Sequence, residues 1–321
     1  MSINPIQMQP GLPLPEFFAK YGAETQCEEA LKQIRWPRGF RCPTCGHDAA
    51  CEFMRSKTRY WECRKCGHQT SLTAGTMMHQ SQLPLTKWFL AVYLMTQSKN
   101  NIAALALRRE LGITWRAAWL LKHKLMDAMR QREDCQPLSG DIRVDDAYLG
   151  GERTGGKVGR GSENKTAFVV SIEMRDNRPQ RVRFDPVDGF SFAALRPWAA
   201  TALVPGSTIT SDGLIGFEVV RQLGFEHRVK IAPKGKAGTE IEAYRWLNVV
   251  LGNLKRSLSG TLHAFKYSKY AARYFAEAQY LFNRRADLPA LIPRMLSALV
   301  MAKPCPRGKI ACPLAESEQE T

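Results

Sequence analysis

The stretch IRVDDAYLGG, residues 142–151, decides how the rest of the chain is interpreted. Ile142, Val144 and Tyr148 favour a short strand, and the two glycines end it. Carboxylates are depleted in strands, so two in succession need a reason. Either both are solvated at a strand end, or they are metal ligands on the central strand of a sheet of the kind found in nucleases. The stretch alone leaves both interpretations open.

The segments that follow predict a mixed α/β domain. AFVVSIEM (167–174) and RVRFDPV (181–187) predict a hairpin, and further strands are expected at 208–213 and 228–232. Helices are expected at 191–202, 239–258, 266–285 and 288–301. Carboxylates at the ends of neighbouring strands can converge, and a third oxygen ligand from a following helix would complete a site for two hard cations. Mg²⁺ or Mn²⁺ at such a site supports in-line attack on a phosphodiester.

The charge of the chain points to a polyanionic partner. The 321 residues carry a formal net charge of +16, which favours nucleic acid, with an anionic membrane as the alternative. No stretch approaches the roughly 18 to 20 apolar residues that a spanning helix needs. The N-terminus, MSINPIQMQPGLPLPEFF, lacks the basic and apolar regions of a signal peptide. We therefore expect a cytoplasmic protein that has no membrane partner.

Four cysteines form two Cys-x-x-Cys-Gly knuckles, Cys42 with Cys45 and Cys63 with Cys66. The spacing between the knuckles fits a four-cysteine zinc site, and in a reducing cytoplasm paired cysteines indicate metal rather than disulfides. Four sulfur ligands suit tetrahedral Zn²⁺ and leave no open position, so this zinc would be structural. With short strands at 53–55 and 60–62, the region is expected to be a zinc ribbon. The alternative is four cysteines paired by chance.

Residues 84–130 are predicted to be helical. Helices are expected after Pro84, from Ile102 to Leu111, and from Trp115 to about Arg130, with Gly112 ending the second and Thr114 capping the third. One face of the third helix is apolar: Ala118, Leu121, Leu125 and Ala128. The basic and aromatic outer face, with Arg116 and Lys122, favours a DNA-binding helix-turn-helix. The alternative is an ordinary helical hairpin with a solvated face. A single helix is expected earlier, from Glu16 to Ile34.

Four motifs in the second half of the chain carry a family resemblance. VDDAYLGG, SDG, WLNVVLGNLKRSLSGTLHAF and YLFNRR together resemble the bacterial insertion-sequence transposases, relatives of the eukaryotic Merlin elements. Those proteins join an N-terminal zinc ribbon and a helical DNA-binding region to a DDE-type, ribonuclease-H-like core. The resemblance runs from about Glu16 to Arg285. It implies an α/β ribonuclease-H-like core preceded by a small zinc ribbon and an all-α helix-turn-helix region.

The boundaries expected from this resemblance divide the chain into five parts. They are an N-terminal lead-in and helix (1–35), a zinc ribbon (36–75), a helix-turn-helix region (76–132), a transposase core (141–290) and a C-terminal helix and tail (291–321).

The resemblance also assigns catalytic positions. Asp145 matches the first catalytic aspartate, Asp146 takes the place of an acid that commonly follows it, and Asp212 matches the second aspartate. The third position falls on Asn248, where many members have glutamate and others asparagine or histidine. Its carbonyl oxygen can ligate a metal but brings no charge. Glu242 lies off the matching register.

Seven basic or polar residues are expected to contact DNA: Arg116, Lys122, Lys157, Arg160, Lys255, Arg256 and His263. Lys157 and Arg160 lie in a glycine-rich loop that could clamp phosphates. Lys255 and Arg256 suit the DNA backbone or are simply solvated. His263 could contact the scissile phosphate or cap the next helix. The arginines of residues 283–285 (Asn-Arg-Arg) are expected either to bind DNA or to interact with the negative end of a helix dipole.

We therefore expect a transposase that binds the terminal inverted repeats of its insertion sequence, cleaves at their ends and joins the 3′ hydroxyls to target DNA. Two Mg²⁺ or Mn²⁺ ions would serve catalysis. Pairing two DNA ends implies a homodimer or larger assembly on double-stranded DNA, associated with the nucleoid. The alternatives are a domesticated zinc-ribbon/helix-turn-helix regulator with an inactive core, and a structure-specific nuclease without strand transfer.

Overall fold

The computed structural model describes residues 6, 8–56, 58–97, 101–150, 165–231, 242–262 and 267–311. They form two compact units. One comprises Met1–Ala128 with Ala286–Arg307, and the other Met129–Arg285 with Gly308–Thr321. Among the described residues, no helix is long and apolar enough to cross a membrane.

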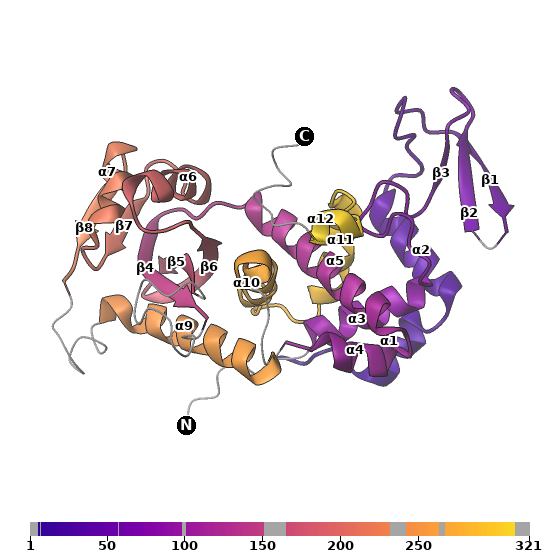
Figure 1. The fold of residues 1–321 in the computed structure, drawn as a ribbon. Coiled ribbons are helices and arrows are strands. Elements are labelled where there is room, and N and C mark those ends of the chain that lie inside the picture. The colour runs from indigo at the N-terminus through magenta and orange to yellow at the C-terminus, as the bar shows by residue number, and fades with distance from the viewer. Residues whose placement is uncertain are drawn as a thin grey trace. The chain divides into compact units, whose positions relative to one another are not determined.

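The first unit begins with two helices, α1 (Leu14–Tyr21) and α2 (Glu24–Arg35) (Figure 1). The expectation of one continuous helix here is wrong. Gly22 ends α1, its N–H bonding the carbonyl of Phe18, and Ala23 is extended at φ −103° and ψ 148°. The Gln26 side chain then accepts the Ala23 N–H at 2.9 Å, which caps the start of α2.

The cysteine-rich segment folds as a three-stranded antiparallel sheet of β1 (Ala50–Arg55), β2 (Thr58–Cys63) and β3 (Gln69–Ser71), in that order. A small apolar core anchors it to the residues that follow α2. Trp61 of β2 is 2 % exposed, and its ring lies edge-on to Trp36 with centroids 4.9 Å apart.

The helical part of this unit contains α3 (Leu85–Thr96), α4 (Ala104–Leu111) and the first part of α5 (Trp115–Asp134). Gly112 ends α4 in the left-handed conformation, φ 60°, and the Thr114 hydroxyl accepts the Ala117 N–H at the start of α5. Both helix boundaries are as expected, and so is the buried apolar face of α5. The helix α11 (Leu291–Met301) packs on α2 and α3.

The second unit is built on a five-stranded sheet of β4 (Asp141–Leu149), β5 (Thr166–Arg175), β6 (Arg178–Pro186), β7 (Thr208–Ser211) and β8 (Glu226–Val229). The spatial order is β6-β5-β4-β7-β8. β4, β5 and β6 are antiparallel, whereas β7 and β8 run parallel to β4. Asp176 and Asn177 have positive φ, as a two-residue turn of the expected hairpin requires. β8 lies two to three residues before its expected position.

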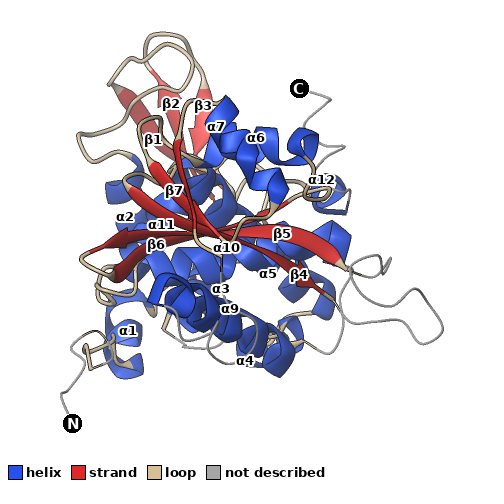
Figure 2. Ribbon diagram, turned by 90° about the vertical axis from the view of Figure 1, so that its left-hand side faces the viewer, coloured by secondary structure: helices blue, strands red, loops and turns tan. Residues whose placement is uncertain are grey.

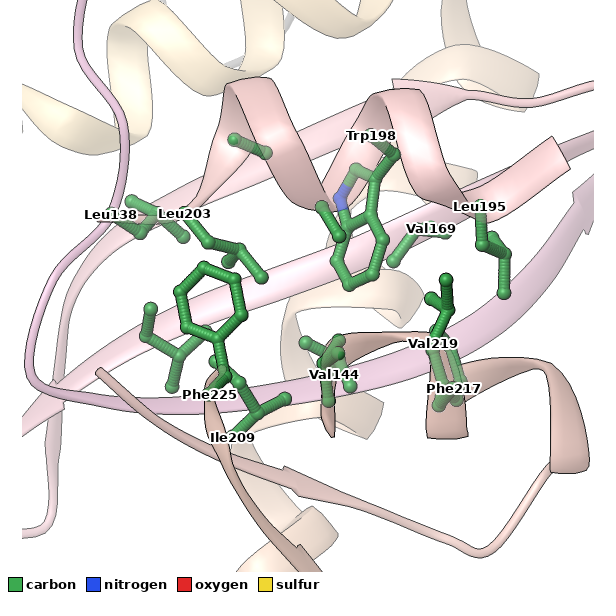
Figure 3. Packing of buried hydrophobic residues seen from close by; sticks show 14 residues of the cluster. Leu138, Val144, Val169, Leu195, Trp198, Leu203, Ile209, Phe217, Val219 and Phe225 are labelled. Atoms are coloured by element: carbon green, nitrogen blue, oxygen red, sulfur yellow. The ribbon is translucent and has the colours of Figure 1, made fainter. Parts of the chain in front are cut away.

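Helices of the same unit cover both faces of the sheet (Figure 2). α6 (Phe192–Ala202), a 3₁₀ turn (Ile215–Glu218) and α7 (Val219–Gln222) lie on one face. There Ile142 and Val144 of β4 pack with Trp198 of α6 and Phe217 in one buried cluster (Figure 3). α9 (Glu242–Thr261) packs on β4 and β5, and α10 (Tyr267–Asn283) on β6 and β5. A short helix, α12 (Arg307–Ala311), closes the described chain. This strand order with helices on both faces is the ribonuclease-H-like fold, as expected.

Candidate functional site

The two cysteine knuckles of the ribbon have the same backbone geometry. In the first, Cys42 N–H bonds His47 O and Gly46 N–H bonds Cys42 O, both at 2.9 Å. In the second, Cys63 and Gly67 make the corresponding bonds at 3.0 and 2.9 Å. Gly46 and Gly67 have φ of 72° and 68°, a conformation that glycine adopts without strain. Each glycine therefore permits the turn that aims two sulfurs at one point.

The four sulfurs of these knuckles fit a tetrahedral metal. The Sγ atoms of all four cysteines lie within 4.8 Å of one another, and the Cys42–Cys66 and Cys45–Cys63 pairs are 3.6 Å apart. A zinc–sulfur bond of about 2.3 Å in a tetrahedron places sulfurs about 3.8 Å apart. A disulfide would need about 2.05 Å. Burial raises the pKa of Cys42, but hydrogen bonds from the backbone of Cys45 and Thr44 and from the thiols of Cys66 and Cys45 together outweigh it and lower the pKa to about 6.

A second cluster gathers three carboxylates in the ribonuclease-H-like unit. Asp145 and Asp146 lie in β4, and Asp212 follows β7 directly; each offers an oxygen within 4.8 Å of the others. β4 and β7 are parallel neighbours, so their chains run toward the same edge of the sheet. All three residues are half-buried. The structure thus brings together Asp145 and Asp212, as the sequence predicts, and adds Asp146.

Local structure holds these carboxylates in place. Ile142 and Val144 are buried in the cluster beneath α6, which fixes β4 directly before its acidic pair. The Asp145 carboxylate accepts the N–H of Asp146 at 2.9 Å. Asp212 accepts the N–H of Leu214 at 3.1 Å across a turn where Gly213 has φ 95°. Three anions so close together repel one another unless a cation joins them, and a donor set made only of oxygens suits Mg²⁺ or Mn²⁺.

Tyr244 of α9 is a neighbour of the carboxylates that sequence reasoning missed. Its side chain is 5 % exposed, and its single O–H hydrogen is shared between the carbonyl oxygens of Ser211, at 2.9 Å, and Lys230. Burial first, and then the negative charges of Asp212 and Asp145, raise the pKa of Tyr244 to about 12. The phenol is therefore a protonated donor beside the acidic cluster.

The residue before Asp212 is also held by a buried histidine. His227 of β8 has a fully buried side chain, and its Nε2 lies 2.8 Å from the hydroxyl of Ser211. Its Nδ1 lies 3.5 Å from a carboxylate oxygen of Glu218. Burial lowers the pKa of His227, and the charge of Arg221 lowers it further against the opposing effect of Glu218. Ser211 is thus fixed through both its side chain and its carbonyl.

Asn248, the expected third ligand, lies on α9 one helical turn after Tyr244 and is exposed. Residues four apart lie on the same side of a helix. Asn248 therefore lies on the same side of α9 as Tyr244, which contacts the end of β7. Lys255 and Arg256, further along α9, are also exposed, as is Arg116 at the start of α5. Lys157, Arg160 and His263 lie outside the described residues.

The expectation that Lys122 lies on the outer face of its helix is wrong. It is 1 % exposed, and its ammonium donates to the carbonyl of Ile102 at 2.6 Å. The residues from Leu121 to Met129 are buried without interruption, so this part of α5 has no solvated stripe. Lys122 is committed to the protein interior and does not face a phosphate.

The side chains of the Asn-Arg-Arg sequence at residues 283–285 make hydrogen bonds within the fold. Arg284 pairs with the buried carboxylate of Glu133 and also donates to the carbonyl of Tyr280 at 3.2 Å. Arg285 donates to Gln180 O at 3.0 Å and to Phe282 O at 2.8 Å. The two guanidinium groups thus bond the last carbonyls of α10, which is the helix-terminus alternative considered above. Tyr148 likewise packs, with its ring edge-on to Phe190 at 5.5 Å.

A ribonuclease-H-like sheet that gathers carboxylates at β4 and β7, in a chain with a four-cysteine ribbon, is the arrangement expected of the DDE-type transposase class. Comparison with protein families agrees in both parts of the chain. Residues 22–69 match the transposase zinc-ribbon domain, and residues 137–283 match the ISXO2-like transposase domain. The chain belongs to this family of insertion-sequence transposases.

Two curated relatives match shorter parts. A Halobacterium salinarum protein described as an uncharacterized protein in transposable element ISH50 is 28% identical over 130 residues, covering 40% of this chain and 42% of the relative. Large ribosomal subunit protein eL43 of Methanococcus aeolicus is 33% identical over 51 residues, covering 16% and 50%. The chain therefore spans half or less of the length of these relatives.

Proposed function

We propose that this protein is a DNA transposase that cleaves phosphodiesters at the ends of its insertion sequence and joins the freed 3′ hydroxyls to target DNA. The observation that carries the proposal is the gathering of Asp145, Asp146 and Asp212 on the ribonuclease-H-like sheet. The family membership and the net charge of +16 support DNA as the substrate.

The proposed chemistry has two displacements at phosphorus. In the first, water attacks the phosphodiester at the element's end and a 3′ hydroxyl leaves. In the second, that hydroxyl attacks a target phosphodiester and displaces the target's own 3′ oxygen. Two divalent cations bound at the carboxylates would activate the attacking oxygen and stabilise the leaving one. Asp145 and Asp212 would hold them, with Asn248 as the third ligand.

The remaining parts would bind and position DNA. The ribbon (36–75) and the helical region (76–132) would find the terminal inverted repeats, and Arg116 is exposed where α5 begins. Lys255 and Arg256 are exposed on α9 and would bind backbone phosphates of the DNA held at the core (141–290). Because two ends are joined in one reaction, at least two protomers are expected on the DNA.

Asn248 favours one alternative function. A neutral amide in the third position leaves the site one negative charge short of the glutamate pattern, which is what a domesticated DNA-binding regulator with an inactive core would tolerate. The presence of three gathered carboxylates counts against it, because a DNA-binding protein gains nothing from acids at a DNA-facing site.

One experiment separates these functions. A labelled duplex carrying the element's own ends is incubated with Mg²⁺ or Mn²⁺ and either the wild type or Asp145→Asn. We expect cleavage and strand-transfer products from the wild type alone. Cleavage without joined products indicates a nuclease. Bound but uncut DNA with both proteins contradicts the transposase and supports the regulator.

A further inference from the structure

The end of β7 is joined to α9 by a single phenol. Tyr244 Oη lies 2.9 Å from the carbonyl oxygen of Ser211 and also bonds the carbonyl of Lys230, which follows β8. Its ring is nearly fully buried. The hydroxyl therefore connects α9 to the ends of two neighbouring parallel strands, on the side of the sheet that carries the acidic cluster.

The contact on Ser211 matters because Asp212 is the next residue. Ser211 O also accepts the Lys230 N–H at 2.9 Å, and the Ser211 hydroxyl is held by His227 at 2.8 Å. Those two bonds come from β8 and its continuation. The Tyr244 bond comes from α9, four residues before Asn248. It thus links the strand end that carries one proposed metal ligand to the helix that carries another.

A second tether on the same helix provides a comparison. Trp246 Nε1 donates to the carbonyl of Asn177 at 2.9 Å, in the turn between β5 and β6. That bond also holds α9 to the sheet, but it reaches a turn that bears none of the three carboxylates.

We propose that Tyr244 is a positioning residue for the active site: through the carbonyl of Ser211 it sets the separation between Asp212 and the α9 position of Asn248. This inference rests on the proposed function. A phenol with the ordinary pKa of about 10 is protonated at neutral pH and can donate; burial and the charges of Asp212 and Asp145 raise this pKa further, to about 12. The same bond would keep α9 in place when the DNA phosphate arrives.

The test uses zinc-loaded, full-length protein in four forms: wild type, Tyr244→Phe, Trp246→Phe and Asp145→Asn. Mn²⁺ affinity is measured by electron paramagnetic resonance without DNA, and the single-turnover cleavage rate is measured at saturating DNA. We expect Tyr244→Phe to weaken Mn²⁺ binding and to slow cleavage by about three- to tenfold each, equivalent to one hydrogen bond. DNA affinity should stay unchanged.

The control variants separate the possible outcomes. Trp246→Phe should keep Mn²⁺ affinity although it loses a hydrogen bond on the same helix; an equal loss in both variants would mean general anchoring of α9 and would overturn the proposal. Unchanged Mn²⁺ affinity in Tyr244→Phe would also overturn it. If Asp145→Asn binds Mn²⁺ as the wild type does, the proposed metal site itself fails, and the inference fails with it.

A second measurement does not require removal of the hydroxyl. With 3-fluorotyrosine at position 244, the ¹⁹F resonance should shift on addition of Mg²⁺ and should not shift in the Asp145→Asn background. A resonance that is insensitive to Mg²⁺ in both proteins would contradict a link between Tyr244 and the acidic cluster.

Discussion

Both polar atoms of the Asn283 amide bond the backbone of Val182. The Val182 N–H donates to Oδ1 at 2.7 Å, and Nδ2 donates to the Val182 carbonyl at 3.1 Å. One turn earlier, Gln279 accepts the N–H of Phe184 at 3.2 Å. Residues four apart on a helix are separated by about 6 Å, close to the span of two residues in a strand. α10 therefore satisfies the open edge of β6 as a neighbouring strand would.

Replacing this amide should destabilise the fold. Asn283→Leu keeps the branching at Cγ but leaves the buried Val182 N–H and carbonyl without these partners, and it also removes the 2.7 Å bond from Nδ2 to the Glu133 carboxylate. We expect a cost of about 1–3 kcal/mol. Urea unfolding monitored by circular dichroism measures the change. The control is Asn253→Leu at an exposed position of α9, which should change stability by less than about 0.5 kcal/mol. Equal effects of the two would show that the edge contact contributes little.

Loss of one knuckle cysteine should release the zinc. Cys63→Ser removes a buried thiolate ligand, and because a ribbon this small depends on its metal, the ribbon should unfold. We expect the zinc content to fall from one equivalent to near zero and binding to the element's ends to be lost. Cys51→Ser, at an exposed cysteine of β1 outside the four-sulfur cluster, is the control. Retained end binding by zinc-free Cys63→Ser would show that the ribbon does not read DNA.

The proposed third metal ligand, Asn248, can be tested with substitutions that should leave the fold unchanged. Asn248→Ala should lose strand transfer while it still binds the element's ends, because the side chain is exposed on α9 and its proposed role is at the metal site. Asn248→Asp supplies the missing charge and should bind Mn²⁺ more tightly than the wild type. Gel assays of cleavage and joining, together with a binding isotherm, measure both variants. Full activity of Asn248→Ala would place the third ligand elsewhere.

Binding to DNA should weaken steeply as salt rises, because cations are displaced from phosphates. If Lys255 contacts one phosphate, Lys255→Ala should reduce the slope of log affinity against log salt by about 0.9. The same substitution at exposed Arg294, which pairs with Asp287 in the other unit, should leave the slope unchanged. Fluorescence anisotropy from 50 to 300 mM salt gives both slopes. A slope in Lys255→Ala equal to that of the wild type would show that Lys255 does not contact a DNA phosphate.

Stability should decline in mild acid because of His227. Burial, with Arg221 nearby, holds its folded-state pKa below the ordinary value of about 6.5, while Glu218 opposes the shift. The unfolded chain therefore takes up more protons, so this contribution to stability is full above pH 6.5 and is lost as the pH falls. Unfolding free energies at pH 7.5 and 5.5 should differ more for the wild type than for His227→Gln, which does not titrate. Equal differences would contradict this assignment.

The sequence predicted the parts of both sites that depend on local pattern. Two Cys-x-x-Cys-Gly knuckles fix a sulfur cluster because their turns are local. Asp145 and Asp212 converge because parallel neighbouring strands bring their acids to one region of the sheet. Asp146 was recognised as a second acid but was not assigned as a ligand. Alternation of side chains along a strand argues against adjacent residues sharing a site.

Other features depend on tertiary contacts that no local pattern encodes. Lys122 falls outside the apolar stripe of its helix, yet α5 is buried on all sides there and the ammonium reaches the carbonyl of Ile102. In the sequence, Tyr244 cannot be distinguished from other buried aromatic residues. Its contacts with Ser211 and Lys230 at the strand ends depend on the tertiary structure. The break at Gly22 was missed because the apolar residues on both sides of it fit one helical period.

The inclusion of Ala286–Arg307 in the same compact unit as residues 1–128 has a consequence for the order of synthesis. Leu299 O bonds the N–H of Met77 at 3.0 Å, and α11 packs on α2 and α3. A ribosome delivers α11 only after residues 129–285, which hold the five-stranded sheet of the ribonuclease-H-like unit. The unit with the zinc ribbon is thus begun first but is completed only after the five-stranded sheet has been made. A nascent chain stopped before residue 286 therefore carries its carboxylates before it has a finished N-terminal unit.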